Sequence, residues 1–273
     1  MTQSESIKLG RPAARRFFTG RWQEGWSKLA MRFLGLAVFL LLWEAAPRLG
    51  WVETTYLSPP SAVLETLISM TATGELVEHF LWSLQRVLIG LAISTVVGVF
   101  LGLFIGYFHS VEIYLDLLFQ FFRQMSAFAL FPVFILFFGL GELSKDIIIF
   151  WASLWPVLLN TINGVKNVDH LLIDSARSMG ASEGFIFRKI ILPAAAPDIF
   201  TGIRLGASYC VMAVVAAEMI GATAGLGYLV MYSQETFHVS AMYGSIVALA
   251  ILGVGLNYIL YIVQKRLISW KRY

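Results

Sequence analysis

Residues 82–108 read WSLQRVLIGLAISTVVGVFLGLFIGYF, and Arg86 is the one charged side chain among them. A helix needs about 20 mostly apolar residues to cross a bilayer, so this stretch predicts a membrane-spanning helix. The whole chain of 273 residues has the same character: 58% of its residues are hydrophobic, 14% are charged, and its mean hydropathy is +0.74. A soluble domain carries about 25% charged residues. The composition therefore predicts one membrane domain and no soluble domain.

Small residues recur at every fourth position of this stretch, a spacing that places them on one face of a helix. Lipid provides no hydrophobic drive for helices to associate, whereas small side chains let two backbones approach and gain dispersion contacts. The ridge therefore predicts a tight helix–helix contact, either within the chain or between two copies of it. Gly202 and Gly206 repeat the spacing in a later apolar block. The ridge consists of Gly90, Ser94, Gly98, Gly102 and Gly106.

Five further apolar blocks predict five further spans, which gives an all-α, polytopic membrane helix bundle of about six transmembrane helices. The first block has the basic flank of a signal peptide, but Glu44, Pro47 and Arg48 make a poor cleavage site, so we interpret it as an uncleaved helix. A polar connection, 51–80, contains a short helix that Ser61 is placed to cap. The five blocks are residues 33–46, 115–138, 146–163, 199–221 and 241–263.

Lysine and arginine in the loops predict the orientation, because cytoplasmic segments carry an excess of both. Residues 1–32 hold seven of them, the loop 164–198 holds four and the C-terminal tail holds four, whereas the other side carries Arg48 and Lys145. Both termini are therefore expected in the cytoplasm. Because these charges are spread along one membrane face, we exclude nucleic acid as a partner. The expected parts are a cytoplasmic segment, 1–32, and a transmembrane domain, 33–273, with a core of about 80–264.

Polar side chains inside the predicted spans are few, and such groups face the bundle interior or a water-filled path because burying them in lipid is costly. Arg123 lies inside the third block, and two interpretations stay open: it attracts an anion, or it snorkels to the interface or pairs with Asp116. Glu218, close to the outer end of its span, is interpreted as structural. The candidates for the lining of a pathway are Arg123, Gln124, Ser126, Asn160 and Asn163.

Within the basic loop 164–198, residues 174–193 read DSARSMGASEGFIFRKIILP. The first part predicts a short amphipathic helix, and Gly180 can adopt the positive φ that ends it. Ser182 is placed to cap a second short helix, which Pro193 is expected to stop before the fifth span. Two short helices at a sharp angle form a compact knob on the inner face. Its apolar residues could fill a groove on a partner; they are Met179, Phe185 and Phe187.

The spacing in this loop resembles a motif of the permease subunits of bacterial ATP-binding cassette (ABC) importers. That motif reads EAA, three residues, G, nine residues, I, one residue, LP; here Asp replaces Glu and Ser replaces the first Ala. Similarity to the nitrate/sulfonate/taurine branch of these permeases covers about 55–270, through stretches such as 139–145 and 225–229. Many members of that branch have Arg-Pro-x-Pro where residues 123–126 read RQMS. The motif positions are Asp174, Ser175, Ala176, Gly180, Ile190, Leu192 and Pro193.

The resemblance implies a type I ABC importer in the bacterial cytoplasmic (inner) membrane. It would contain two copies of the permease as a homodimer, two cytoplasmic ATPase subunits and an external substrate-binding protein. ATP and Mg²⁺ would bind to the partner ATPase, and this chain would hold no cofactor and no metal. Residues 174–193 would couple to the ATPase. The solute would be a small anion such as a sulfonate, taurine or nitrate, with a vitamin precursor as the alternative within the family.

Two other classes of function fit the sequence less well. A membrane enzyme would need converging catalytic groups, but the four histidines lack metal-ligand spacing and no Gly-x-Ser-x-Gly occurs. Without a Gly-Lys dipeptide the chain has no phosphate-binding loop for ATP, so hydrolysis is expected in a separate subunit. A gradient-driven secondary transporter would be indicated by inverted repeats, and dependence on a proton or sodium gradient would favour it.

Overall fold

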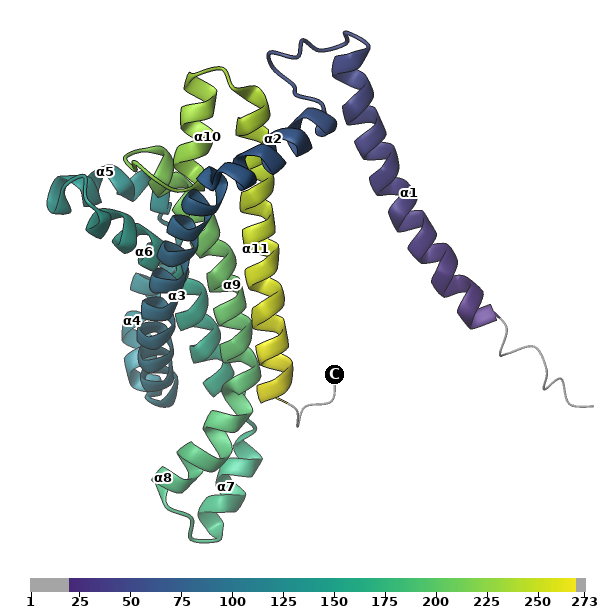
Figure 1. Ribbon diagram of the computed structural model, residues 1–273. Helices are drawn as coiled ribbons and strands as arrows, with labels where there is room; N and C mark the ends of the chain where they lie inside the picture. Colours follow the sequence, from purple (N-terminus) through teal and green to yellow (C-terminus); the bar gives the residue numbers. More distant parts are fainter. Residues whose placement is uncertain (1–19, 269–273) are drawn as a thin grey trace, which may run out of the picture. The chain divides into compact units, whose positions relative to one another are not determined.

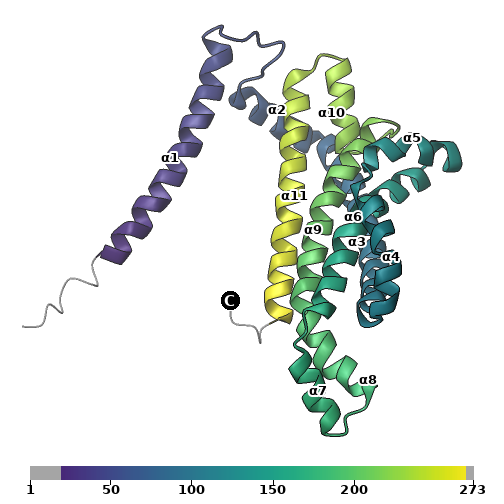
Figure 2. The same cartoon turned by 180° about the vertical axis from the view of Figure 1, so that it is seen from behind.

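A computed structural model describes residues 20–268 of the chain, with side chains from Leu34 onward except that of His109. The chain divides into two compact units, Met1–Ser61 and Ala62–Tyr273, and each is described by itself. All regular structure in the described range is helical, which confirms the all-α prediction (Figures 1 and 2).

The first unit contains helix α1, Gly20–Arg48, followed by a turn and an extended connection. The connection folds back on the end of α1, where the Trp43 indole donates to the Ser58 carbonyl oxygen at 3.0 Å. The Glu44 carboxylate accepts from the Ser61 amide at 3.0 Å and from the Ser61 hydroxyl at 2.7 Å. These bonds fix where the chain leaves the helix.

Two expected boundaries change in this region. Ser61 does not cap the next helix, because that helix already begins at Pro60 and the Ser61 side chain binds Glu44 instead. Proline suits the first helical position, since its missing N–H would have no partner there. The first predicted span, 33–46, lies within α1, which begins inside the segment expected to be polar; residues 1–19 of that segment lie outside the described residues.

The helices of the second unit follow one another through short connections. Most of α2 belongs to this unit, and its long helices α3, α6, α9 and α11 lie side by side (Figures 1 and 2). The bounds are α2, Pro60–Thr73; α3, Glu75–Tyr107; α4, His109–Gln124; α5, Ala127–Phe138; α6, Glu142–Lys166; α7, His170–Ser178; α8, Glu183–Ile186; a π-helical turn, Phe187–Ile191; α9, Leu192–Met219; α10, Leu226–Glu235; and α11, Val239–Leu267.

Four of the described helices are long and apolar enough to cross a membrane: α3, α6, the continuous run Glu183–Met219 that includes α9, and α11. The number becomes five if the bent pair α4 and α5 counts as one span. The total of six and the orientation of the termini stay predictions, because they depend on α1 and on residues outside the described range.

The third predicted span, 115–138, is not a single helix in the structure but falls in the bent pair α4 and α5. The chain bends by 94° between α4 and α5, and Met125 and Ser126 adopt extended backbone conformations at the bend. The polar stretch Arg123–Ser126 interrupts the apolar block at this point. A broken helix leaves backbone groups without helical partners, and membrane proteins tolerate such a break where it is buried in protein or lines a water-filled cavity.

Helix α6 packs between α3 and α9 through small residues on both neighbours. A Cβ atom added to any of the four ridge glycines of α3 would come within 2.3–2.9 Å of an α6 side chain. On the α9 side, Gly202 faces Asn160 and Gly206 faces Val157 in the same way. Ser94, the fifth ridge residue, is buried and donates its hydroxyl to the Leu91 carbonyl oxygen. The structure thus places the α3 ridge in a contact within the chain.

Buried charges join the helices at the predicted outer end. The Arg86 guanidinium donates to Glu218 at 2.7 Å and to Glu142 at 2.8 Å. Glu218 is fully buried and also accepts from the Ser83 hydroxyl and from the Gly227 amide, each at 2.8 Å. Every charge in this cluster has a partner, so it fastens α3, α6, α9 and the start of α10 together.

Candidate functional site

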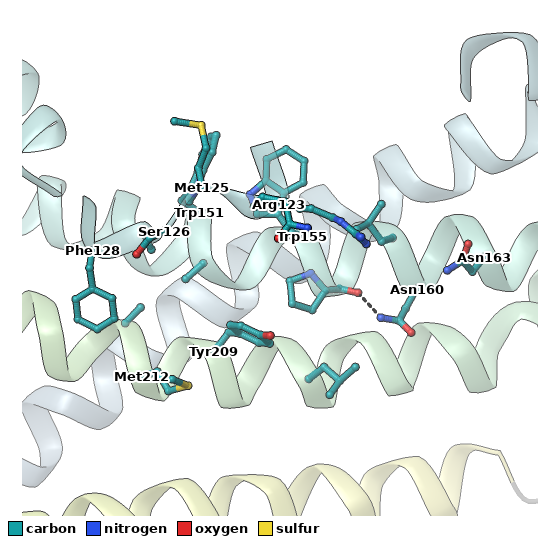
Figure 3. A pocket seen from close by; sticks show the side chains of 17 residues that line it. Arg123, Met125, Ser126, Phe128, Trp151, Trp155, Asn160, Asn163, Tyr209 and Met212 are labelled. Atoms are coloured by element: carbon teal, nitrogen blue, oxygen red, sulfur yellow. Dashed lines mark hydrogen bonds between the residues drawn. The ribbon is translucent and has the colours of Figure 1, made fainter. Parts of the chain in front are cut away.

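A cavity of about 610 Å³ opens beside the break between α4 and α5 (Figure 3). Its lining comes from the break itself and from one face each of α6 and α9. All five pathway candidates, which lie far apart in the sequence, contribute to it. The full lining is Arg123, Gln124, Met125, Ser126, Ala127, Phe128, Trp151, Ala152, Trp155, Pro156, Leu159, Asn160, Asn163, Leu205, Tyr209, Met212 and Ala213.

Arg123 lies in the last turn of α4, not in the middle of a straight span. Its guanidinium has no ion pair or hydrogen bond with any side chain that the structure describes. The proposed pairing with Asp116 is not observed: the Asp116 carboxylate accepts from the Gln120 amide at 3.1 Å. Among the lining residues Arg123 carries the one formal charge, so the cavity wall is positive.

The amides of α6 lie toward one end of the cavity, and two large apolar side chains lie toward the other. Figure 3 shows Asn160 and Asn163 at the first end and Phe128 and Met212 at the second. The Asn160 side-chain amide donates to the Pro156 carbonyl oxygen at 2.8 Å, which fixes its orientation on α6. The arrangement can hold a small solute with a charged group and an apolar body.

Aromatic rings stiffen the wall on the α6 side. Trp151 and Trp155 meet edge to face with centroids 5.2 Å apart, and Phe122 stacks on Trp155 at 6.1 Å. Both indole nitrogens are buried and have no hydrogen-bond partner among the described residues. Aromatic pairs of this geometry contribute about 0.5–1.5 kcal/mol beyond the area that they bury, so they stabilise this wall.

Sequence reasoning missed the aromatic part of the lining, although a signal for it exists. Trp151 and Trp155 precede Asn163 by twelve and eight residues, so all three share one face of a helix. Asn163 could therefore have led to the tryptophans through the register of α6, whereas Asn160 is not in that register. No comparable signal points to Tyr209, because its place depends on how α9 packs against α6.

The inner loop forms the expected knob of two short helices, which we call the inner knob and define as residues 170–191 (α7, α8 and the π-helical turn). Asp169 caps α7 by accepting from the Leu171 amide at 2.9 Å. Gly180 has a φ of +81°, and the Ser182 hydroxyl accepts from the Phe185 amide at 3.4 Å at the start of α8. Backbone geometry at Gly180 and Ser182 thus agrees with the local sequence signals.

Pro193 does not stop the second helix, which is a correction to the sequence-based expectation. The chain passes from α8 through the π-helical turn into α9 without a break, and Pro193 lies in the first turn of α9. At the junction the Leu192 amide donates to the Phe187 carbonyl oxygen, five residues back. The wider π-helical turn tolerates a proline here, because the ring would clash with the carbonyl four residues earlier in a regular α-helix.

The motif residues differ in their exposure. Asp174, Ser175 and Gly180 are exposed, whereas Ala176 packs with Ile191 and neighbours in a small core at the inner end of the bundle. Ile190 and Pro193 are half-buried and Leu192 is exposed on the returning helix.

The apolar tips of the inner knob also differ from one another. Met179 is 81% exposed and Phe185 is 53% exposed, as a docking surface requires. Phe187 is turned inward and packs edge to face on Tyr107, so the expectation that it is exposed is wrong. Helices α6 and α9, which line the cavity, connect directly to the two ends of this knob.

Known proteins are similar to this chain in sequence and in fold. Residues 94–273 match the family described as "Binding-protein-dependent transport system inner membrane component". An aliphatic sulfonates transport permease protein, SsuC, of Bacillus subtilis (strain 168) is 31% identical over 92% of this chain and 90% of its own length. The taurine transport system permease protein TauC of Escherichia coli (strain K12) is 32% identical over 92% of this chain and 93% of its own length.

A solved structure agrees with the fold. A chain in the structure titled "Inward facing conformations of the MetNI methionine ABC transporter" aligns with a TM-score of 0.53, at 21% identity, over 70% of this chain and 98% of that one. The family match covers most of the present chain, and the sequence relatives cover nearly all of it. The chain therefore belongs to the family of inner membrane components of binding-protein-dependent transport systems, and it is a multi-pass ABC transporter permease of the cytoplasmic membrane.

Proposed function

We propose that this permease imports a small organic anion, and that the cavity beside the α4–α5 break is the place where the anion crosses the membrane. The observation that carries the proposal is the Arg123 guanidinium, which faces the cavity without a carboxylate partner among the described residues. A cation left unpaired at membrane depth is costly, and a passing anion would relieve that cost. Two relatives are named for solutes with a sulfonate group, and a sulfonate is an organic anion of the proposed kind.

The proposal includes an assembly of two copies of this chain, two cytoplasmic ATPase subunits that bind ATP and Mg²⁺, and an external binding protein. The cavity is open on one side, and a second copy would close it. The exposed Met179 and Phe185 on the inner knob are suited to a groove on the ATPase. Residues 174–193 would carry the movement of the ATPase to α6 and α9, which are joined to the knob and line the cavity.

The decisive experiment measures ATP-dependent uptake of a radiolabelled organic sulfonate, with taurine as the first candidate, into proteoliposomes. These contain the permease, the ATPase and the binding protein encoded with it. Arg123→Gln should lower uptake about tenfold, because a hydrogen bond to a charged group is worth about 1.5–3 kcal/mol and about 1.4 kcal/mol corresponds to a factor of ten. Arg123→Lys, which keeps the charge, should retain most of the uptake.

Arg266→Gln is the matched control, since Arg266 is an exposed arginine near the end of α11 and outside the cavity. It should transport like the unmodified protein. Wild-type uptake by Arg123→Gln would refute the role of the guanidinium. Uptake driven by a proton or sodium gradient without ATP would refute the importer proposal as a whole.

A further inference from the structure

A carboxylate outside the loop motif joins the inner knob to the end of α3. The Tyr107 hydroxyl, on the last residue of α3, donates to Glu183 Oε2 at 2.9 Å. Glu183 is the first residue of α8, and it also accepts from Arg177 of α7: Nε lies 2.9 Å from Oε1 and Nη2 lies 3.2 Å from Oε2. One carboxylate on α8 thus links that helix to α3 and α7.

The position of this carboxylate makes it a brace across the turn at Gly180. Arg177 and Glu183 lie on opposite sides of that turn, so their two-pronged contact restrains the angle between α7 and α8. Fork-like arginine–carboxylate contacts fix geometry as well as adding energy. Arg177 also lies 3.6 Å from the motif residue Asp174, which connects the brace to the exposed face of the knob.

The Tyr107 ring adds an apolar contact to the same joint. It meets the Phe187 ring edge to face with centroids 5.6 Å apart, in the π-helical turn that leads into α9. The tyrosine therefore touches the knob twice, once through its hydroxyl and once through its ring. Replacing it with phenylalanine would remove the first contact and keep the second.

Movement of α3 would reach the cavity because α3 is locked to α6. The glycine ridge brings the two backbones so close that a Cβ at Gly102 would lie 2.6 Å from Thr161, and one at Gly106 would lie 2.9 Å from Val165. Helix α6 carries the tryptophans and asparagines of the cavity wall. Coupling between distant sites travels through packed, rigid elements of this kind.

We propose that Glu183 and Tyr107 are positioning residues for energy coupling, through which displacement of the inner knob pulls the inner end of α3. This inference rests on the proposed coupling function of residues 174–193 and extends it to a second route. The knob is then connected to the bundle along the chain, through α6 and α9, and across space, through the Tyr107–Glu183–Arg177 contact. The second route makes α3 move together with its partner α6.

The test compares the number of solute molecules imported per ATP hydrolysed in proteoliposomes that contain the complete importer. Tyr107→Phe and Glu183→Gln should each lower that ratio by about threefold to tenfold, the range expected for side chains that carry coupling between sites. The double variant should be no worse than the more severe single variant, because both changes break the same contact. Thermal unfolding and the yield of assembled complex should stay unchanged.

Two matched variants control for general effects. Glu112→Gln removes a carboxylate that binds Lys166 at 2.7 Å at the same end of the bundle but does not contact the knob. Tyr258→Phe removes an exposed hydroxyl from α11. Both variants should keep the wild-type ratio of solute imported to ATP hydrolysed. A variant that only lowers the yield of assembled complexes would also keep this ratio, because uptake and ATP hydrolysis would fall together.

The outcomes separate this inference from the function on which it rests. If the unmodified importer shows no ATP-dependent uptake, the proposed function fails. If the unmodified importer couples normally and Tyr107→Phe and Glu183→Gln keep its ratio, the proposed function stands and the role of the Tyr107–Glu183–Arg177 contact is wrong. Strictly additive losses in the double variant would also overturn the idea of a single joint.

Discussion

Two arginines in this permease lie in opposite surroundings. Arg86, at the predicted outer end, is 5% exposed and donates to Glu218, to Glu142 and to the Ala224 carbonyl oxygen. Arg123, at the cavity, has no hydrogen bond or ion pair with any described side chain. The difference teaches how to separate the two roles of a charge in a membrane protein: a charge with a full set of partners holds helices together, and a charge without partners is available to a solute.

The same contrast extends to the surroundings of each arginine. Around Arg86 the Ser83 hydroxyl donates to Glu218 and in turn accepts from the Leu226 amide at 2.8 Å, so the cluster closes on itself. Along the cavity the tryptophan nitrogens have no partner among the described residues. Buried polar networks stabilise a fold when every member is satisfied, whereas a buried polar group without a partner costs free energy.

The largest effect is expected from breaking the closed cluster. Glu218→Ala would leave the buried Arg86 charge without its closest carboxylate, and removing one partner of a buried ion pair costs about 3–5 kcal/mol. We expect a large loss of the folded protein, measured as yield and as the thermal unfolding temperature in detergent. Glu235→Ala is the control, since Glu235 is exposed on α10. An unchanged unfolding temperature for Glu218→Ala would contradict the structural role of the cluster, and so would an equal drop for Arg123→Gln.

The next largest effect on stability is expected at the contact between α3 and α6, the helices that connect the two regions. Gly102→Val would drive side-chain atoms into Thr161 of α6, where the added Cβ alone would lie 2.6 Å from the Thr161 Cβ. Overpacking of this kind costs about 1–3 kcal/mol, so we expect a clear drop in the unfolding temperature. Gly255→Val on α11 is the matched control, because a Cβ there meets no atom within 4 Å. Equal stability of the two variants would mean that α3 and α6 do not pack so closely.

The smallest effect on stability, but a specific one on transport, is expected at the inner knob. Gly180→Val would force a β-branched residue to a φ of +81°, at a cost of about 1–2 kcal/mol. The strain should misdirect the knob, so ATP hydrolysis would continue with reduced import while the bundle stays folded. Gly184→Val tests the same loop at a position where a Cβ has free space and φ is not positive. Wild-type transport by Gly180→Val would show that the turn does not guide coupling.

Much of this fold could be predicted from the sequence because its signals are local. The apolar blocks predicted the long helices α3, α6, α9 and α11, since the need to keep backbone groups bonded in lipid leaves few other structures. Gly180 predicted where α7 ends, and Ser182 predicted where α8 begins. Both signals are local, because a positive φ and a helix cap depend on a few neighbouring atoms.

The errors and omissions arose where distant residues decide. The polar stretch at 123–126 does not by itself show that the chain bends by 94° there, and Pro193 does not by itself show that the helix continues through it. Nothing near Glu218 in the sequence shows that its partner is Arg86, which lies 132 positions earlier.

The sequence by itself thus determined the membrane class, the small-residue ridge of α3, the two short helices of the loop 164–198 and the family. Only the tertiary structure decided that the ridge packs against α6, that Arg86 is satisfied and Arg123 is not, and that Glu183 reaches Tyr107. The physical reason is that apolar runs and backbone turns are properties of neighbouring residues, whereas the partner of a charge depends on which helices pack together. Whether a charge has a structural or a functional role depends on its surroundings, which the sequence around it does not show.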